Sequence, residues 1–392
     1  MKRPGGSHLE YHLLVLVTLG LVAFGLVMVY SASSARALLS ADAPSYYLKR
    51  QAIYAVMGLV ALVILSRFDF HRLRHATQPL LAVTLVLLVA VLAIGTAVNG
   101  ARRWIPIGFM NFQPSELAKL VLALWTAALL ARRPAPRTLG ELAKPIGVVV
   151  GLACALILIE PDLGTAIAIA IMVSAILVVS GTRLRLLASA AGIATSVVLI
   201  AIWLEPYRRE RIFSFLDPWH DPQGAGFQSV QSMIALGSGG FFGVGLGESV
   251  QKIYYLPEAS TDMIFAIVGE ELGLIGAMGV IAAFAVFAYA GFNIALHCRD
   301  PFGKRLAAGI TALICGQAAV NVSAVMGIAP LTGIPLPFVS YGGSSLVVGL
   351  AAVGILLNIA SNHAVVRETE VPDRGRRNRR TRASGTRRRR VA

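Results

Sequence analysis

The segment that decides the character of this chain is YYLPEASTDMIFAIVGEELGLIG, residues 254–276. It passes from a polar stretch that contains Asp262 directly into an apolar helix that carries Glu270 and Glu271. Ionisable side chains at membrane depth are energetically costly, so they are functional candidates by default. On a helix, Asp262 shares its face with small residues that let a neighbouring backbone approach closely. These small residues are Ala266, Gly269, Gly273 and Gly276.

Two interpretations of Asp262 are open at this point. Capping of the helix by Thr261 or Asp262 would explain both residues structurally. Alternatively, Asp262 is a reactive carboxylate on a rigid, closely packed helix that faces a polar cavity. Glu270 and Glu271 lie about two turns deeper, at roughly 80° and 180° around the helix from Asp262. We therefore expect those two glutamates to pair with neighbouring helices or to line the cavity floor.

The composition is that of a membrane protein. Of the 392 residues, 56% are apolar and only 14% are charged, and the mean hydropathy is +0.71, which excludes a soluble globular domain. Apolar runs of about 17–25 residues, long enough to span a bilayer, recur along the chain. We predict an all-α polytopic membrane protein with about ten transmembrane helices. The predicted spans are residues 11–31, 51–66, 79–98, 114–131, 145–159, 164–180, 186–205, 262–292, 306–329 and 344–361.

The predicted topology places both termini on one side of the membrane. An even number of spans has this consequence, and Lys2, Arg3 and the arginine-rich C-terminus make that side cytoplasmic. The long connection between the seventh and eighth spans, residues 206–261, is then extracytoplasmic, and a loop of this length is usually functional. We expect a transmembrane domain, residues 1–361, followed by a basic, disordered cytoplasmic tail, residues 362–392, that suits anionic lipid headgroups.

The charge and the cysteines argue against other protein classes. The net charge is +15, but arginines of the C-terminal tail dominate it, and nothing elsewhere in the chain supports nucleic-acid binding. The three cysteines, Cys154, Cys298 and Cys315, are scattered and form no C-x-x-C spacing. Neither a disulfide framework nor a zinc site is therefore supported.

A cluster of cations is predicted on the extracytoplasmic side. Arg102, Arg103 and Lys119 lie in the segment NGARRWIPIGFMNFQPSELAK, residues 99–119, where positive charge has no role in setting topology. Such a cluster suits an anionic ligand such as a diphosphate. Glu116 lies three residues before Lys119 on the same helix face, so a local ion pair is the structural alternative.

Two further extracytoplasmic segments carry polar groups. Residues 160–166, EPDLGTA, form a short turn in which capping by Asp162 or Thr165 is favoured on local grounds. Residues 327–346, GIAPLTGIPLPFVSYGGSSL, contain prolines and glycines that break helices, and such backbone at membrane depth lines a cavity or is buried in protein. Ser340 and Tyr341 offer hydroxyl groups there, beside backbone amides suited to an anion.

Seven motifs in collinear order resemble the SEDS family of bacterial peptidoglycan polymerases, which includes FtsW, RodA and SpoVE. The resemblance covers residues 11–361, and GLGESVQK and SFLDPW are similar to the division and sporulation branch. Glu160 stands where many relatives have glutamine, and STDM stands where HTDF is commoner. The motifs are VMVYSAS (27–33), GARRWI (100–105), FQPSELAKL (112–120), EPDLGTA (160–166), SFLDPW (214–219), GLGESVQKIYYLPEASTDMIFAIVGEELG (245–273) and TGIPLPFVSYGGSS (332–345).

The resemblance implies a glycosyltransferase that polymerises lipid II, an undecaprenyl-diphosphate-linked disaccharide-pentapeptide, for septal wall synthesis in cell division. Asp262 matches the family's catalytic aspartate, which as a general base would accelerate the reaction by about 10²–10⁴-fold. Attack on the donor's anomeric carbon would invert α to β and release undecaprenyl diphosphate. The expected substrate-binding residues are Arg102, Arg103, Glu116, Lys119, Asp162, Ser340 and Tyr341.

The resemblance also implies partners and leaves alternatives open. The expected partners are lipid II, undecaprenyl diphosphate, a class B penicillin-binding protein transpeptidase, other divisome proteins and membrane lipids, at the septal cytoplasmic membrane. A divalent cation, Mg²⁺ or Mn²⁺, is compatible with Asp262 and a diphosphate, but no cofactor follows from the spacing. A lipid II flippase, a polymerase of the elongation or sporulation type, and a non-catalytic scaffold are the alternatives. Polar residues concentrated on one side of the membrane favour an enzyme over a carrier.

Overall fold

The computed structural model describes residues 6–39, 43–98, 101–108, 110–203, 209, 213–253 and 255–369. Within them, eight helices are long and apolar enough to cross a membrane, and two shorter apolar helices, Leu163–Val179 and Leu184–Ser196, accompany them. Together these helices correspond to the ten predicted spans. The prediction of an all-α polytopic membrane protein is therefore confirmed.

Most elements of the fold are helices. The helices are α1 (Gly6–Leu39), α2 (Tyr46–Arg67), α3 (Phe70–Ile94), α4 (Pro114–Arg132), α5 (Leu139–Leu142), the π-helical turn η1 (Ala143–Gly147), α6 (Val148–Ile159), α7 (Leu163–Val179), α8 (Leu184–Trp203), α10 (Phe227–Ser238), α11 (Ile264–His297), α12 (Pro301–Val325) and α13 (Gly343–Thr369). The strands are β1 (Thr96–Val98), β2 (Ala101–Ile107) and β3 (Met110–Phe112).

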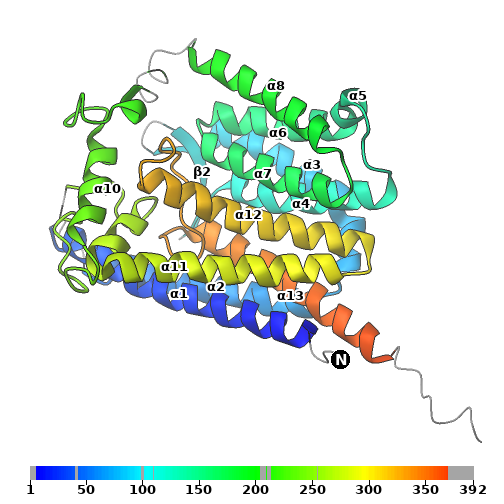
Figure 1. The fold of residues 1–392 in the computed structure, drawn as a ribbon, viewed down its shortest axis with the longest axis horizontal. Helices are drawn as coiled ribbons and strands as arrows, with labels where there is room; N and C mark the ends of the chain where they lie inside the picture. The colour runs from blue at the N-terminus through cyan, green and yellow to red at the C-terminus, as the bar shows by residue number, and fades with distance from the viewer. Residues whose placement is uncertain are drawn as a thin grey trace, which may run out of the picture.

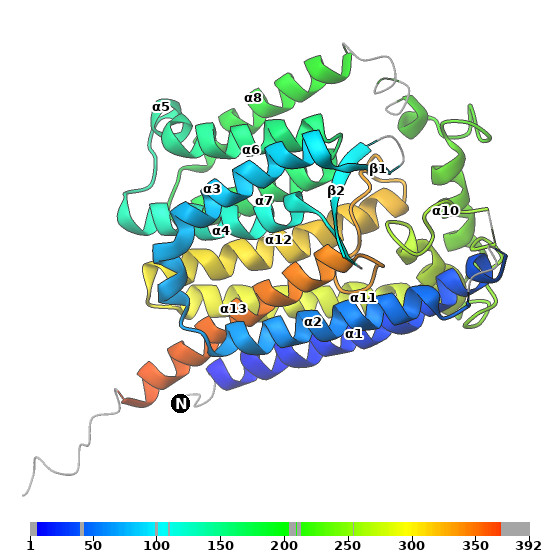
Figure 2. The same cartoon turned by 180° about the vertical axis from the view of Figure 1, so that it is seen from behind.

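The long helices run side by side as one bundle (Figure 1). α4 lies at its centre, because 83% of its most apolar stretch is buried, against 22% for α2 at the periphery. The N-terminal end of α1 and the C-terminal end of α13 lie at the same end of the bundle, as the even number of spans requires (Figures 1 and 2). α10 lies at the opposite end, beyond the end of α1, so the described part of the long connection between α8 and α11 lies at that end (Figures 1 and 2).

A small antiparallel sheet lies between α3 and α4, at the same end of the bundle as α10 (Figure 2). Its strand order is β1-β2-β3, and Ile105 of β2 pairs with Phe112 of β3. No strand was predicted here: residues 96–98 were expected at the end of a spanning helix and residues 99–113 in a connection, because strands of three to seven residues are too short to give a clear alternating pattern.

The helix α11 is interrupted at Gly273. This residue has φ 65° and ψ −163°, so the chain leaves the helical conformation there and then re-enters it. A Cβ atom at Gly273 would lie 2.4 Å from the backbone nitrogen of Gly243 and 2.6 Å from the carbonyl oxygen of Phe241. Because both the positive φ and the backbone contacts exclude a side chain, this position requires glycine.

Backbone groups near the interruption bind the preceding loop. The amides of Val244 and Gly245 donate to the carbonyl oxygens of Glu270 and Glu271, at 3.0 and 3.1 Å. On the other side, the amide of Leu274 donates to the carbonyl oxygen of Gly240 at 2.9 Å. The loop thus takes the place of the intrahelical partners that the break removes.

The expectation that Asp262 shares a helix face with Gly273 and Gly276 is wrong. α11 begins at Ile264, and Asp262 lies in the turn before it. The break at Gly273 also ends the regular helical period that the expectation assumed. The physical reason is tertiary: the backbone of residues 239–245 packs against the helix at this point.

The predicted boundary between domain and tail falls inside a helix. α13 continues from Gly343 to Thr369, past the expected end of the transmembrane domain at residue 361. Residues 370–392, with most of the C-terminal arginines, lie outside the residues that the structure describes. The basic cytoplasmic tail therefore stays a prediction.

Replacing Gly273 by alanine should destabilise the protein strongly. Gly273→Ala introduces a Cβ against the backbone of residues 241–243 at a positive φ, so we expect a loss on the order of 2 kcal/mol or more in the free energy of unfolding. Gly279→Ala is the matched control in the same helix, because no atom lies within 4 Å of its added Cβ. Thermal unfolding in detergent measures both variants, and equal melting temperatures would contradict the role of Gly273.

Candidate active site

Asp262 lies in a turn that Asn321 of α12 fixes in place. The side-chain amide of Asn321 donates to the carbonyl oxygen of Asp262 at 2.7 Å and to that of Ile334 at 2.8 Å. Asn321 is only 3% exposed, so these bonds are shielded from water. Asn321 was not among the predicted site residues, although an asparagine within an apolar helix indicates a buried polar contact.

The segment SYGGSS, residues 340–345, is hydrogen-bonded to the same turn. The hydroxyl of Ser340 donates to the carbonyl oxygen of Thr261 and accepts the amide of Leu336 at 2.8 Å. The amide of Tyr341 donates to the carbonyl oxygen of Ser260 at 2.8 Å. The structure thus brings Ser340 and Tyr341 next to Asp262, as expected, and it uses the Ser340 hydroxyl to hold the backbone.

The carboxylate of Asp262 is half-buried. The hydroxyl of Thr261 lies 3.3 Å from its Oδ1. A Cβ built on Gly333 would lie 3.9 Å from Oδ2, so the loop after α12 approaches the carboxylate from the other side. Asp262 is therefore held by its backbone on a rigid turn, while its side chain keeps partial access to solvent.

Glu116 and Lys119 form a buried ion pair. The Lys119 ammonium lies 2.8 Å from a carboxylate oxygen of Glu116, and it donates to Oε1 of Gln317 at 3.2 Å. Together with Phe338 and Ser345 they line a cavity of about 20 Å³, room for roughly one water molecule. The local ion pair predicted as the structural alternative is therefore present, and it lies directly beneath the segment that contains Ser340.

Asp162 caps the helix α7. Its carboxylate accepts the amide of Thr165 at 3.0 Å and the hydroxyl of Thr165 at 2.8 Å, which confirms the capping interpretation. It also accepts the side-chain amide of Gln113 at 3.2 Å, and the backbone amide of Gln113 donates to Ser344 at 3.0 Å. Gln113, which the sequence reading did not single out, thus connects Asp162 to the start of α13.

The three predicted cations have different environments. Arg103 donates to the carbonyl oxygen of Glu160 at 2.7 Å and to that of Pro161. Arg102, the preceding residue of β2, is exposed and points to the opposite face of the strand, because neighbouring side chains of a strand alternate between its faces. Lys119 is 2% exposed. Within the described part of the chain, Arg103 and Lys119 bind different partners, so the combined action of the three cations on one ligand stays a prediction.

Glu160 is a fully buried carboxyl group. Neither of its carboxyl oxygens has a hydrogen-bond partner within the described part of the chain. Burial raises the pKa of Glu160 to about 8, with Asp162 adding to the rise and Arg103 opposing it. The group is therefore mainly protonated at neutral pH. A protonated glutamic acid has the neutral charge and nearly the size of a glutamine side chain.

Glu270 and Glu271 have structural partners. Glu271 pairs with Lys252 at 2.8 Å and accepts from Ser31 of α1, and Glu270 binds the turn at residues 249–251. The expectation that these glutamates pair with neighbouring helices holds for Glu271, which binds Ser31 of α1, whereas Glu270 binds a turn of the long connection and not a helix. Within the described ranges no three histidine, cysteine, aspartate or glutamate side chains are grouped to hold a metal ion, and the divalent cation compatible with Asp262 and a diphosphate stays a prediction.

Replacing Glu160 by glutamine should change how stability depends on pH. In the wild type the pKa of Glu160 is raised from 4.5 to about 8 on folding, so the stability that its protonated form contributes is present below pH 4.5 and is lost as the pH rises towards 8. Glu160→Gln has no carboxyl group to ionise, so its stability does not fall in this way as the pH rises. We expect its melting temperature to equal that of the wild type near pH 5 and to exceed it near pH 8.5.

The exposed carboxylate of Glu248 supplies the control for this experiment. Glu248→Gln should show no pH-dependent gain in melting temperature. A constant difference between Glu160→Gln and the wild type from pH 5 to pH 8.5 would contradict a protonated Glu160.

Comparison with known proteins finds relatives of nearly the same length. The model of a family of cell cycle proteins, FtsW, RodA and SpoVE, matches residues 11–364. A probable peptidoglycan glycosyltransferase FtsW of Trichlorobacter lovleyi is 43% identical over 356 residues, which cover 90% of this chain and 93% of the relative. Stage V sporulation protein E of Bacillus subtilis is 40% identical over 352 residues, covering 89% and 96%.

Solved structures have the same fold. A structure described as "Structural coordination of polymerization and crosslinking by a peptidoglycan synthase complex" superimposes with a TM-score of 0.74 at 33% identity, over 89% of this chain and 97% of that one. The rod shape determining protein RodA of Thermus thermophilus superimposes with a TM-score of 0.66 at 30% identity, over 89% and 96%.

Proposed function

This chain belongs to the FtsW, RodA and SpoVE family of cell cycle proteins, and we propose that it polymerises lipid II into glycan strands at the outer face of the cytoplasmic membrane. Relatives that are about 40% identical over nearly the whole chain are named peptidoglycan glycosyltransferases, which supports this class of enzyme. The observation that carries the proposal is the position of Asp262: a half-buried carboxylate on a rigid turn at the end of the bundle that gathers the polar segments.

Asp262 acts as the general base. Its carboxylate accepts the proton of the acceptor sugar's hydroxyl group while the oxygen attacks the anomeric carbon of the donor. The bond between that carbon and the phosphate oxygen breaks, and its electron pair leaves with undecaprenyl diphosphate. The attack inverts the anomeric centre from α to β. A positioned base of this kind contributes about 10²–10⁴-fold to the rate.

The diphosphate leaving group needs positive charge and hydrogen-bond donors. Arg102 is exposed on β2, and the first amides of α13 follow Tyr341 and Gly342, so these groups are candidates for contact with the phosphates. Lys119 and Glu116 line a small cavity together with Phe338 and Ser345 of this segment, so their charges reach the ligand only if the segment moves. Arg103 and Asp162 hold the turn at residues 160–165 next to β2.

A location and a partner accompany this function. The chain is a multi-pass membrane protein, and we propose that both termini are cytoplasmic and that the end with Asp262 is extracytoplasmic. We also propose a septal location in cell division, which the similarity to proteins named FtsW supports. A class B penicillin-binding protein is the proposed partner, since a related solved structure is described as a complex that couples polymerization and crosslinking.

The distribution of polar residues supports an enzyme over a flippase. Alternating access requires a site near the middle of the membrane between two repeated halves. Here the sheet, α10 and the long connection before α11 lie at one end of the bundle (Figures 1 and 2). Asp262 belongs to this region through its contacts with Asn321 and the loop after α12.

Neutralising Asp262 should abolish polymerisation. Asp262→Asn keeps the size of the side chain but removes the base, so we expect glycan synthesis from purified lipid II in detergent to fall by roughly 10²-fold or more. The amount and length of the glycan products are measured by gel electrophoresis. Glu248→Gln, at an exposed carboxylate of the same long connection, should retain activity. Normal glycan synthesis by folded Asp262→Asn would refute the assignment.

The Glu116–Lys119 pair requires a double substitution. Lys119→Met alone leaves a buried carboxylate without its cation, which typically costs about 3–5 kcal/mol. Glu116→Gln/Lys119→Met removes both charges, so we expect a melting temperature near that of the wild type but a loss of polymerisation. Arg137→Ala, at an exposed arginine, is the control. Wild-type activity of the double variant would exclude a role for Lys119 in the reaction.

A further inference from the structure

The segment that presents Asp262 is a short helix of its own. The break at Gly273 separates residues 264–272 from the spanning part of α11, residues 274–297. Asp262 precedes this short helix and Glu271 lies at its other end, about 13 Å away along the helix axis. Because the two parts of α11 are not one continuous rod, the orientation of the short helix depends on its own contacts.

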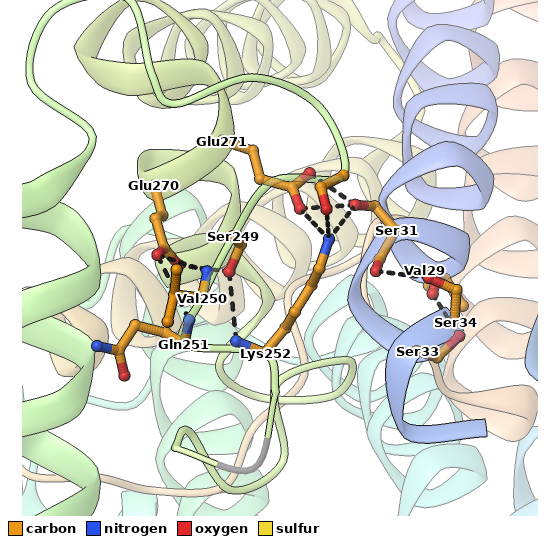
Figure 3. A network of polar contacts seen from close by, with 11 residues as sticks. Val29, Ser31, Ser33, Ser34, Ser249, Val250, Gln251, Lys252, Glu270 and Glu271 are labelled. Atoms are coloured by element: carbon orange, nitrogen blue, oxygen red, sulfur yellow. Dashed lines mark hydrogen bonds and ion pairs between the residues drawn. The ribbon is translucent and has the colours of Figure 1, made fainter. Parts of the chain in front are cut away.

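The end of the short helix at Glu271 is held by a buried cation. The Lys252 ammonium lies 2.8 Å from Oε1 of Glu271 and donates to the carbonyl oxygen of Gly247 at 2.6 Å. The hydroxyl of Ser31, from α1, lies 2.6 and 2.7 Å from the two carboxylate oxygens and 3.3 Å from the ammonium (Figure 3). Glu271 is 0% and Lys252 is 5% exposed.

The neighbouring carboxylate, Glu270, holds the same turn. It accepts the hydroxyl of Ser249 and the backbone amides of Val250 at 3.0 Å and Gln251 at 3.4 Å. The hydroxyl of Ser249 in turn accepts the amide of Lys252 at 3.3 Å (Figure 3). Two adjacent glutamates therefore fix the turn at residues 249–252 against the short helix, and the turn delivers the Lys252 ammonium to Glu271.

Stability alone is a poor explanation for this ion pair. Removing two charges from water is costly, and apolar residues of similar volume often serve a protein interior as well or better. In some proteins a buried polar or ionic group instead serves to select one geometry, and we assign that role to this pair. Here the ion pair fixes the relative positions of three elements. Ser31 belongs to α1, Lys252 to the turn and Glu271 to the short helix, and the three side chains contact one another.

We propose that Lys252 is a positioning residue for Asp262, acting through Glu271 and the short helix of residues 264–272. The ion pair fixes one end of this helix to α1, while Asn321 and Ser340 fix the other end at Asp262. A shift of the helix at Glu271 moves the carboxylate of Asp262 relative to the bound sugar. A displacement of about 1 Å in a reacting group costs roughly 10²-fold in rate.

Because this inference rests on the proposed function, the test compares kinetics with stability. The decisive variant is Lys252→Met/Glu271→Gln, which removes both charges and leaves Ser31 a hydrogen-bond partner at position 271. We expect its melting temperature to stay close to that of the wild type. Its kcat for lipid II polymerisation should fall about tenfold or more, while KM changes little, since the substrate does not contact Lys252.

Two further variants complete the experiment. Lys252→Arg keeps the cation in the pair, so it should recover more of the kcat than Lys252→Met. Lys144→Met, at an exposed lysine between α5 and α6, controls for the loss of a positive charge and should keep the wild-type kcat. Glycan formation from lipid II in detergent is measured for every variant, together with its thermal unfolding.

Three outcomes overturn one or both proposals. A double variant with the kcat of the wild type would show that the ion pair does not position Asp262. A double variant in which kcat and melting temperature fall together would show that the pair only supports the fold. In both cases the wild type still polymerises and Asp262→Asn does not, so the proposed function stands. If the wild type itself forms no glycan, the proposed function fails, and the positioning role fails with it.

Discussion

A helix that is interrupted near a membrane must find partners for the backbone groups that the break releases, since lipid provides none. In this protein the break lies at Gly273, and the partners come from residues 240–245 of the long connection before α11. This requirement brings the connection onto the end of the bundle and separates a short helix, residues 264–272, from the spanning part of α11. The turn that carries Asp262 then meets α12 and the loop that follows it.

Buried charge is compensated differently at each place around this end of the bundle. Lys119 neutralises Glu116 within one helix, whereas Lys252 neutralises Glu271 from a loop. Asp162 is satisfied by a helix cap and a glutamine, and Glu160 is mainly protonated at neutral pH because burial raises its pKa. These buried groups are held by the protein itself. Asp262 differs from these groups in its exposure: it is half-buried, which fits its proposed role as the base.

Site contacts between residues close together in the chain were predicted correctly from the sequence. Asp162 caps α7 with a threonine three residues later, and Glu116 pairs with Lys119 one turn away. The prediction was incomplete where partners lie far apart in the chain. Gln113 binds Asp162 across 49 residues, and Asn321 binds Asp262 across 59, so no spacing rule points to either. The shared helix face of Asp262 and Gly273 was wrong because a regular helical period cannot reveal a break that another segment imposes.

The sequence by itself determined the ten apolar segments, their order and the family, because bilayer length and short motifs are properties of contiguous residues. It also drew attention to Asp262, Glu270 and Glu271 as charges in an apolar setting. Only the tertiary structure decided that Asp262 is half-buried on a turn, that Glu270 binds a loop and that Glu271 binds α1. Ser31 and Glu271 are 240 residues apart, and their contact follows from the packing of α1 against α11, which no local pattern encodes.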